Sequence, residues 1–268
     1  MAEGDWVRVP RDGITPGQHI RGAGEDVRAG AEVIPRGTRI GPQHLGLAAS
    51  VGVARLALYR RLRVAIFATG DELVPPGEPL GPGKIYNSNR FTLRGLLVAL
   101  GCEVVDLGQV PDTLEATLEA LREGAQACDL ILTSGGVSVG DEDHVKPAVE
   151  QLGRLDLWRI SIRPGKPLAF GSACGTPFLG SPGNPVSLFA TFVIFARPYI
   201  LRLQGVEGEV RARPLKVRAG FAWPRPDRRR EFMRARIEPG DDGEPRVMVH
   251  ATRSSGVLSS IVWADGLV

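Results

Sequence analysis

The sequence predicts an α/β protein with a doubly wound, mostly parallel sheet, flanked by a partial N-terminal domain and a small C-terminal β domain. Two observations predict the sheet. Short apolar runs alternate with segments whose apolar residues recur every three or four positions, as strands alternate with amphipathic helices. Glycine-rich loops follow several of these runs, as they do at the carboxyl ends of parallel strands. A third observation predicts the β domain, because short alternating segments separated by proline and glycine clusters end the chain.

The composition is that of an ordinary globular protein. The chain has 268 residues, of which 43% are hydrophobic and 24% charged, enough for one large or two ordinary domains. No stretch approaches the roughly 18 apolar residues of a membrane span, and the N-terminus has no apolar run typical of a secretory signal. We therefore expect a cytoplasmic protein that does not contact membranes. A net charge of +3 gives no reason to expect nucleic-acid binding.

The cysteines give no sign of a metal site or a disulfide framework. Cys102, Cys128 and Cys174 are isolated and odd in number. None belongs to a C-x-x-C pair, so neither zinc binding nor disulfide bonding is indicated.

Residues 1–60 are expected to form a partial N-terminal domain concerned with linkage or dimerisation. The segment is rich in glycine and proline, which predicts short strands joined by turns. A short helix is expected over 45–53. Too little hydrophobic surface precedes residue 60 to close an independent core.

Residues 61–203 carry the α/β pattern. Strands are expected at 64–68, 103–106 and from Leu130. A helix between the first two strands should be capped by Asn87, Ser88 or Asn89 and should stop at Gly101. The next helix should begin at Asp112, with Glu115 three residues later as in a capping box.

The later part of this domain should hold two more helices and three more strands. We expect helices at 144–152 and 186–203, the second starting from Asn184 as N-cap and Pro185 at its first position. The strands are expected at 157–162, 168–171 and 176–180. Residues 204–268 should then form an incomplete β domain with strands at 210–217, 231–237 and 246–249.

The loop after the third strand is the strongest functional signal from residue types alone. Leu130–Thr133 is followed by Ser134-Gly135-Gly136-Val137-Ser138-Val139-Gly140. Such a loop lets backbone N–H groups approach an oxyanion, and two hydroxyls add donors. Carboxylates at Asp141 and Asp143 could hold a metal ion. A plain strand-to-helix turn with acidic residues near the helix start is the alternative.

Three other loops should converge on this one, because ligands of doubly wound sheets bind beyond the carboxyl ends of the strands. They are Thr69–Leu73, Arg163–Pro167 and Ser181–Pro185. Each has a structural explanation as well: Asp71 and Glu72 suit a solvated loop, and helix capping explains the last turn. Lys166, between Gly165 and Pro167, is less easily explained as a plain surface lysine.

These loops carry motifs that resemble a known family. Thr69-Gly-Asp-Glu-Leu73, Ser134-Gly-Gly-Val-Ser-Val-Gly140 with Asp143, Pro164-Gly-Lys-Pro167 and Pro182-Gly-Asn-Pro-Val-Ser187 together resemble molybdopterin molybdenumtransferase, the MoeA and gephyrin E-domain family. The resemblance implies insertion of molybdate into adenylylated molybdopterin with Mg²⁺-assisted release of AMP. It also implies a homodimer and contact with the adenylyltransferase of the same pathway.

Carried over to this sequence, the resemblance assigns roles to individual residues. The catalytic group would be Asp71, Glu72, Asp143 and Lys166, and the three carboxylates would also hold Mg²⁺. Substrate-binding residues would be Ser134, Gly135, Gly136, Ser138, Arg163, Gly183, Asn184, Ser187, Arg234 and Ser255. Of these, Arg234 and Ser255 would contact molybdate.

The chain also departs from the family pattern. It starts at what resembles the tail of the family's N-terminal domain, without the Asp-Asn-Ser-Ala-Met-Asp-Gly-Tyr-like motif, and it stops soon after Asp265-Gly-Leu267. Arg163 stands where the family often has a lysine. We therefore expect at most weak insertion activity from this chain alone. Two alternatives remain open: a non-catalytic molybdopterin-binding or scaffold paralogue, and a molybdopterin adenylyltransferase.

Overall fold

A computed structural model describes residues 2–7, 13, 15–137, 144–224 and 227–268. By their internal contacts the residues form two compact units, Met1–Leu58 and Tyr59–Val268. The division expected at residues 60 and 203 into three domains stays a prediction.

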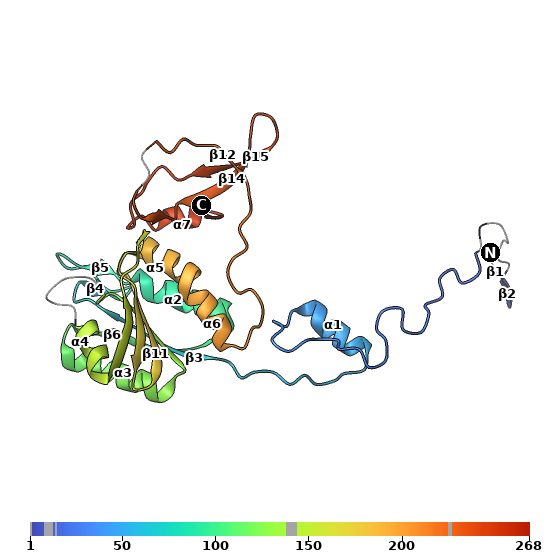
Figure 1. Cartoon of the computed structure of the whole chain (residues 1–268), viewed down its shortest axis with the longest axis horizontal. Helices are drawn as coiled ribbons and strands as arrows, with labels where there is room; N and C mark the ends of the chain where they lie inside the picture. The colour runs from blue at the N-terminus through green and yellow to red at the C-terminus, as the bar shows by residue number, and fades with distance from the viewer. Residues whose placement is uncertain (1, 8–12, 14, 138–143, 225–226) are drawn as a thin grey trace. The chain divides into compact units, whose positions relative to one another are not determined.

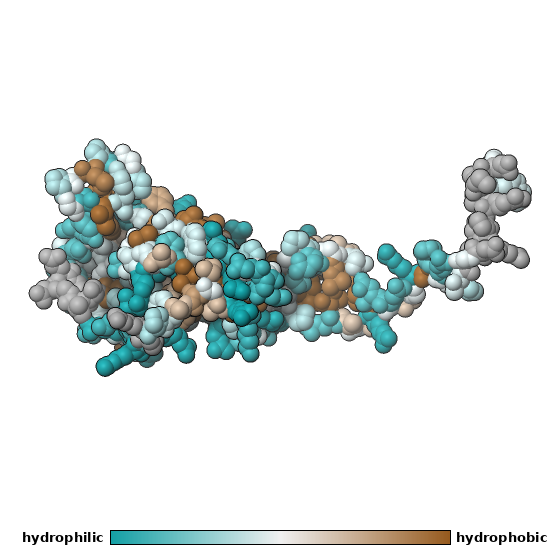
Figure 2. All heavy atoms as spheres, turned by 90° about the horizontal axis from the view of Figure 1, so that it is seen from above, coloured by the Kyte–Doolittle hydropathy of each residue, from teal (hydrophilic) through white to brown (hydrophobic). Residues whose placement is uncertain are grey.

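The first unit buries almost nothing. It holds β1 (Ala2–Glu3), β2 (Trp6–Val7) and α1 (Pro42–Ser50). Among its described residues Ala48 alone is buried. Apolar side chains of and after α1 are exposed, Leu45 by 57% and Val53 by 43%, and Figure 2 shows hydrophobic surface over this segment. As expected, this segment closes no core of its own.

The second unit is built on a six-stranded sheet of order β6-β3-β7-β11-β10-β8 (Figure 1). The four strands β6, β3, β7 and β11 run parallel, β10 pairs antiparallel with β11, and β8 pairs antiparallel with β10 at the edge. The strands are β3 (Arg63–Thr69), β6 (Glu103–Val110), β7 (Leu130–Ser134), β8 (Gly153–Trp158), β10 (Ala169–Ala173) and β11 (Thr176–Ser181). The predicted doubly wound, mostly parallel sheet is confirmed.

Helices cover both faces of the sheet. α2 (Ser88–Ala99) packs on one face together with a long helix that begins at Pro185, and α3 (Leu114–Ala127) and α4 (Val145–Leu152) pack on the other. Alternate residues of β3 enter the two cores: Val64 and Ile66 face α2, whereas Ala65 and Phe67 face α3. A strand buried on both faces reads as a continuous apolar run, which is why it was recognisable in the sequence.

The chain order creates a crevice between β3 and β7. From β3 the chain passes through α2 to β6 on one side, and then through α3 to β7 on the other side of β3. The connections therefore diverge at the carboxyl ends of β3 and β7, which is where open α/β sheets bind ligands.

The long helix has three parts, α5 (Pro185–Thr191), a π-helical turn η1 (Phe192–Ala196) and α6 (Arg197–Leu203). Its length and mean hydropathy of 1.5 are those of a membrane span, so the expectation that no stretch approaches one is wrong. The helix is a core element, however. Phe192 and Ile200 lie in the same core as Leu97 of α2, and no residue over 185–201 is exposed.

Helix starts follow local chemistry with one correction. Asn87 caps α2, accepting a hydrogen bond from the N–H of Arg90 over 3.2 Å. Gly101 follows α2 with a φ of +79°, as a stop residue should. The helix expected from Asp112 instead starts after Thr113, whose hydroxyl accepts from the N–H of Ala116 at 3.2 Å. Both residues can cap, and the chain uses the later one.

The expectation of one strand over 157–162 is wrong. β8 ends at Trp158, where it pairs with Ala169 of β10, and Arg159 then adopts a φ of +96°. The chain turns there, and only Ile162–Arg163 returns to a strand, β9. β9 pairs in parallel with β13 (Arg230–Glu231). It thereby links the α/β domain to the residues after 204.

The C-terminal region forms the predicted small β sheet, of order β12-β15-β14-β16. Its strands are β12 (Arg218–Ala219), β14 (Arg234–Pro239), β15 (Pro245–Val249) and β16 (Gly266–Leu267), and α7 (Ser259–Trp263) packs against β14. The strand expected at 210–217 is absent from these described residues; Pro214 lies in the middle of that segment and cannot donate to a ladder.

Candidate functional site

A cleft of about 640 Å³ opens at the carboxyl ends of β3, β7 and β11. The first turns of α2 and α5 close its other sides, and a short parallel pair, β4 (Leu73–Val74) with β5 (Ile85–Tyr86), adds residues to its lip. The lining residues are Thr69, Gly70, Glu72, Leu73, Ile85, Tyr86, Asn87, Ser88, Asn89, Asp112, Ser134, Gly135, Gly136, Val137, Pro167, Pro182, Gly183, Asn184, Pro185, Ser187 and Gly256. Three of the four loops expected to converge therefore supply several residues, and Arg163–Pro167 supplies Pro167.

Two glycines after β7 form a cradle that no other residue could make. Gly135 and Gly136 have φ values of +88° and +64°. A Cβ on Gly135 would lie 2.6 Å from the carbonyl oxygen of Thr69, and one on Gly136 would lie 2.4 Å from Val145 Cγ2. The close approach to β3 and α4 thus requires glycine at both positions.

The loops after β7 and β11 lie against each other. Ser134 and Ser181 are register partners at the ends of these strands, and the N–H of Gly135 donates to the carbonyl oxygen of Ser181 at 3.1 Å. A Cβ on Gly183 would come within 3.9 Å of Gly135 Cα. The two loops therefore lie close together at the cleft, where a phosphate-like group could approach the backbone.

Polar atoms at this edge of the sheet are buried without partners. Thr69 Oγ1, Ser181 Oγ and Asn89 Oδ1 make no hydrogen bond to any described residue. Buried polar groups are normally paired, and leaving them unpaired costs stability. Unpaired atoms concentrated beside a cleft indicate a site whose partners come from a ligand.

Three carboxylates stand at one side of the cleft. Glu72 and Asp112 line it, and the N–H of Asp112 donates to Asp71 Oδ1 at 3.4 Å. Burial, together with the negative charge of Asp71, raises the pKa of Asp112. Sequence reasoning treated Asp112 only as a helix cap; its place just beyond the carboxyl end of β6 is the signal that could have identified it.

Magnesium fits this acidic group only in part. In 15–137 and 144–268, apart from 225–226, no three His, Cys, Asp or Glu side chains form a ready metal site. Mg²⁺ is usually held by one or two carboxylates plus substrate phosphates and water, however, which Glu72 and Asp112 beside the glycine cradle satisfy. Asp143, the third carboxylate expected here, and Ser138 lie outside the described residues.

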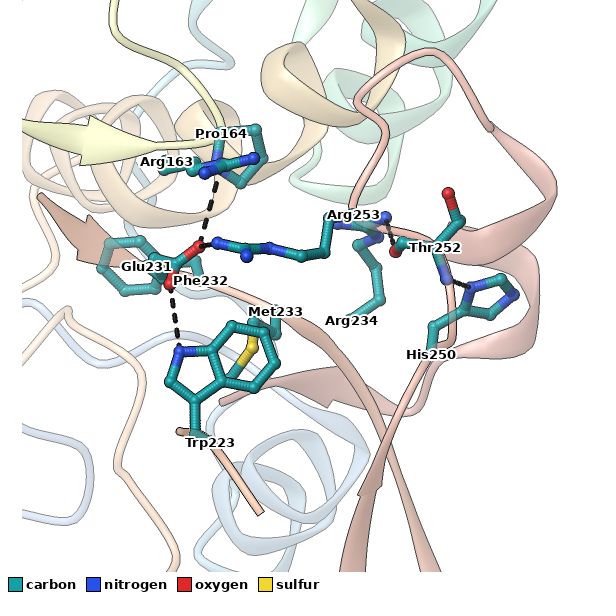
Figure 3. A pocket seen from close by; sticks show the side chains of 10 residues that line it. All are labelled: Arg163, Pro164, Trp223, Glu231, Phe232, Met233, Arg234, His250, Thr252 and Arg253. Carbon is teal, nitrogen blue, oxygen red and sulfur yellow. Dashed lines mark hydrogen bonds and ion pairs between the residues drawn. The ribbon is translucent and has the colours of Figure 1, made fainter. Parts of the chain in front are cut away.

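The predicted cations do not line the cleft. Lys166 is exposed next to Pro167, which does line it. Arg163 and Arg234 lie instead in a second pocket with Trp223, Glu231 and Arg253 (Figure 3).

The arginines of the second pocket are already paired. Arg163 forms ion pairs with Asp227 at 2.9 Å and with Glu231 at 3.7 Å. Glu231 also accepts hydrogen bonds from Arg253 and from Trp223 Nε1, as the dashed lines in Figure 3 show. The side-chain and backbone hydrogen bonds of Arg229, with help from Arg163, lower the pKa of Asp227.

Arg234 and Ser255 hold the C-terminal region together. Buried Arg234 donates to Ser260 Oγ at 3.0 Å and to the carbonyl oxygen of Thr252 at 2.6 Å, and burial lowers its pKa. The carbonyl oxygen of Ser255 accepts from the N–H of Val186 in the first turn of α5, at 3.0 Å. This contact brings Gly256 to the cleft.

The α5 start itself is only partly as predicted. Pro185 occupies its first turn, but the side chain of Asn184 makes no capping bond. Asn184, Ser187 and Gly183 all line the cleft. Their binding role stays a prediction.

Comparison with known proteins places these features in a family. The family model described as "Probable molybdopterin binding domain" matches residues 65–202, just over half of the chain. Models of the MoeA N-terminal region (domain I and II) and C-terminal region (domain IV) match residues 2–52 and 216–268. The chain belongs to the MoeA family of molybdopterin-binding proteins.

Curated relatives and solved structures agree with this assignment. The chain is 49% identical over 191 residues to molybdopterin molybdenumtransferase of Haemophilus influenzae, covering 71% of this chain and 47% of that protein. It is 37% identical over 265 residues to molybdopterin molybdenumtransferase 2 of Mycobacterium tuberculosis, covering 96% and 64%. The Pyrococcus horikoshii MoeA structure superimposes with a TM-score of 0.72 at 29% identity, covering 91% and 59%. Matches to the MoeA family thus cover nearly all of the chain, which spans about half to two thirds of the length of these relatives.

Proposed function

We propose that this chain takes part in molybdenum cofactor biosynthesis by inserting molybdate into adenylylated molybdopterin, with release of AMP. The observation that supports the proposal most is the glycine cradle of Gly135 and Gly136, set between unpaired buried polar atoms and two carboxylates. A ligand with a phosphate link and a polar ring system would use all three. The names of the relatives point to the same chemistry.

In this proposal the phosphate end of the ligand lies against the glycine cradle and accepts from the backbone N–H of Gly136, since the N–H of Gly135 already donates to Ser181. Ser134 and Thr69 would supply hydroxyl donors from the strand ends. The first turn of α5 would add the positive end of a helix dipole. These groups are fixed before the ligand arrives, so they stabilise developing charge without reorganising.

Glu72 and Asp112, with Asp71 behind them, would hold Mg²⁺. Bound there, the ion would supply Lewis-acid stabilisation of charge on the phosphate. These carboxylates would position the ion, and without it they would repel a phosphate. Release of AMP breaks one phosphorus–oxygen bond of the diphosphate link between AMP and the pterin, and water supplies the oxygen that takes its place.

Molybdate is a tetrahedral dianion and needs donors and positive charge. Lys166 is the predicted cation closest along the chain to a cleft residue. Arg163, Arg234 and Ser255 remain predicted oxyanion ligands by resemblance. To bind an oxyanion, Arg163 would have to give up or share its ion pairs with Asp227 and Glu231.

A homodimer and a cytoplasmic location also stay proposals. The exposed apolar residues around α1 support the dimer.

An anaerobic AMP-release assay tests the proposed function. Purified chain is mixed with adenylylated molybdopterin, Mg²⁺ and molybdate, and AMP is measured by chromatography. AMP formation that depends on molybdate supports the proposal. Binding of the ligand without AMP release would identify a non-catalytic binding protein. AMP transfer from ATP to molybdopterin would identify an adenylyltransferase.

A further inference from the structure

Asn89 has one end of its side-chain amide fixed and the other end unpaired. Its Nδ2 donates to the carbonyl oxygen of Gly183 at 2.7 Å, across from α2 to the loop that precedes α5. The residue is 9% exposed and lines the cleft, yet Oδ1 has no hydrogen-bond partner among the described residues. Because only the NH₂ end can donate to a carbonyl, the unpaired end must be the acceptor.

An acceptor at this place selects the kind of ligand group that it can meet. An ionised phosphate has no proton to donate, so Asn89 Oδ1 would repel it. The backbone N–H groups of the glycine cradle have the opposite preference. The cleft is therefore divided into donors that suit an oxyanion and one buried acceptor that suits an N–H or O–H.

We infer that Asn89 is a specificity residue whose Oδ1 accepts a hydrogen bond from an N–H or O–H group of the ligand. The inference rests on the proposed function, which supplies two sources of such a group. One is the nucleotide half, through its amino group or ribose hydroxyls. The other is the pterin half, through its ring N–H and amino groups.

The bond to Gly183 serves this role by holding the amide in one orientation. Without it the amide could turn over and present a donor at the place where Oδ1 now lies. A site that buries an acceptor for a ligand N–H or O–H discriminates against ligands that lack the group, because the acceptor then stays unpaired.

Binding measurements with Asn89→Leu test the inference. Leucine has a similar size but neither donor nor acceptor. Three ligands are titrated anaerobically at pH 8 in excess Mg²⁺: AMP, molybdopterin, and pyrophosphate, whose magnesium complex carries no N–H and essentially no O–H donor. Thr92→Val is the matched control. It removes a hydroxyl that donates to the backbone carbonyl oxygen of Ser88, and Thr92 itself does not line the cleft.

We expect Asn89→Leu to lower the affinity for AMP, for molybdopterin or for both by about 3- to 10-fold, as for the loss of one neutral hydrogen bond. Pyrophosphate affinity should change less than twofold, and Thr92→Val should change no affinity. Loss for AMP alone assigns the donor to the nucleotide, and loss for molybdopterin alone assigns it to the pterin.

Two results would overturn the inference while leaving the proposed function intact. Equal weakening of all three ligands would mean that Asn89 acts only by holding the Gly183 loop. Unchanged affinities would mean that its acceptor meets nothing. If the unaltered chain bound none of the three, the proposed function would fail first, and the inference with it. Should Asn89→Leu not fold, Asn89→Ala carries the same comparison.

Discussion

The backbone N–H of Gly135 donates a hydrogen bond to the carbonyl oxygen of Ser181 over 3.1 Å. This bond continues the pairing of β7 and β11 beyond Ser134 and Ser181, which are the last pair of register partners in the two strands. It places the glycine cradle beside the loop that carries Gly183. Because the two loops form one surface, a substitution in either loop should change the affinity for the same ligand.

Gly183→Ala should weaken ligand binding without unfolding the protein. The backbone of Gly183 does not require glycine, and its Cβ would meet only Gly135 Cα, at the ordinary contact distance of 3.9 Å. The added methyl group would stand between the two loops, where we place the phosphate. We expect pyrophosphate and AMP affinity to fall by roughly tenfold, about one charge-assisted hydrogen bond. Titration together with a melting curve checks this; unchanged affinity would remove the Gly183 loop from the phosphate site.

Gly136→Val should destabilise the protein. Gly136 has a φ of +64°, and a Cβ would lie 2.4 Å from Val145 Cγ2 and 2.8 Å from Thr69 Oγ1. Strain and overpacking together should lower the free energy of unfolding by about 2–4 kcal/mol. Urea unfolding measures the loss. A midpoint equal to that of the unaltered protein would show that the cradle is less tightly packed than described.

Gly95→Ala should do the opposite and serves as the stability reference. Gly95 is an exposed interior residue of α2, and a Cβ there would meet nothing within 4 Å. Alanine should raise the free energy of unfolding by about 1 kcal/mol through the reduced entropy of the unfolded chain. The same urea titration reads this gain. Because Gly95 lies away from the cleft lining, ligand affinity should not change.

Asp112→Asn should stabilise the ligand-free protein at pH 7. Burial and the charge of Asp71 raise the pKa of Asp112, so its ionised form costs folding free energy. Asparagine removes this cost above the raised pKa. As the pH falls through that pKa toward the ordinary value of 3.8, the unaltered protein also becomes neutral there, and the advantage should vanish. Melting temperatures from pH 3.5 to pH 7.5 without Mg²⁺ follow the difference.

Magnesium should affect the unaltered protein and Asp112→Asn differently. If Glu72 and Asp112 hold the ion, added Mg²⁺ should stabilise the ligand complex of the unaltered protein more than that of Asp112→Asn. Equal Mg²⁺ dependence of AMP release in both proteins would contradict the assignment.

Much of the α/β domain could be predicted because its signals are local. The strand of Val64–Ala68 is an apolar run buried on both faces, and Leu93 and Leu97 mark the buried face of α2 by their spacing. The end of β8 could not be predicted in this way. It is set by the turn at Arg159, whose φ is +96°, where the chain leaves its pairing with β10.

The site was predicted where it depends on backbone chemistry and missed where it depends on tertiary contacts. Gly135, Gly136 and Gly183 were recognisable as loop glycines at strand ends. The unpaired acceptor of Asn89 was not, since it follows from a bond to Gly183 far along the chain. The engagement of Arg163 with Asp227 and Glu231 likewise arises only when β9 and β13 pair.

A crystal soaked with AMP or adenylylated molybdopterin would test the central claim, that the cleft at the ends of β3, β7 and β11 is the ligand site. The account predicts phosphate density within hydrogen-bonding distance of the backbone N–H of Gly136. Phosphate density in the second pocket, against Arg163 and Arg253, with the glycine cradle unchanged, would contradict it.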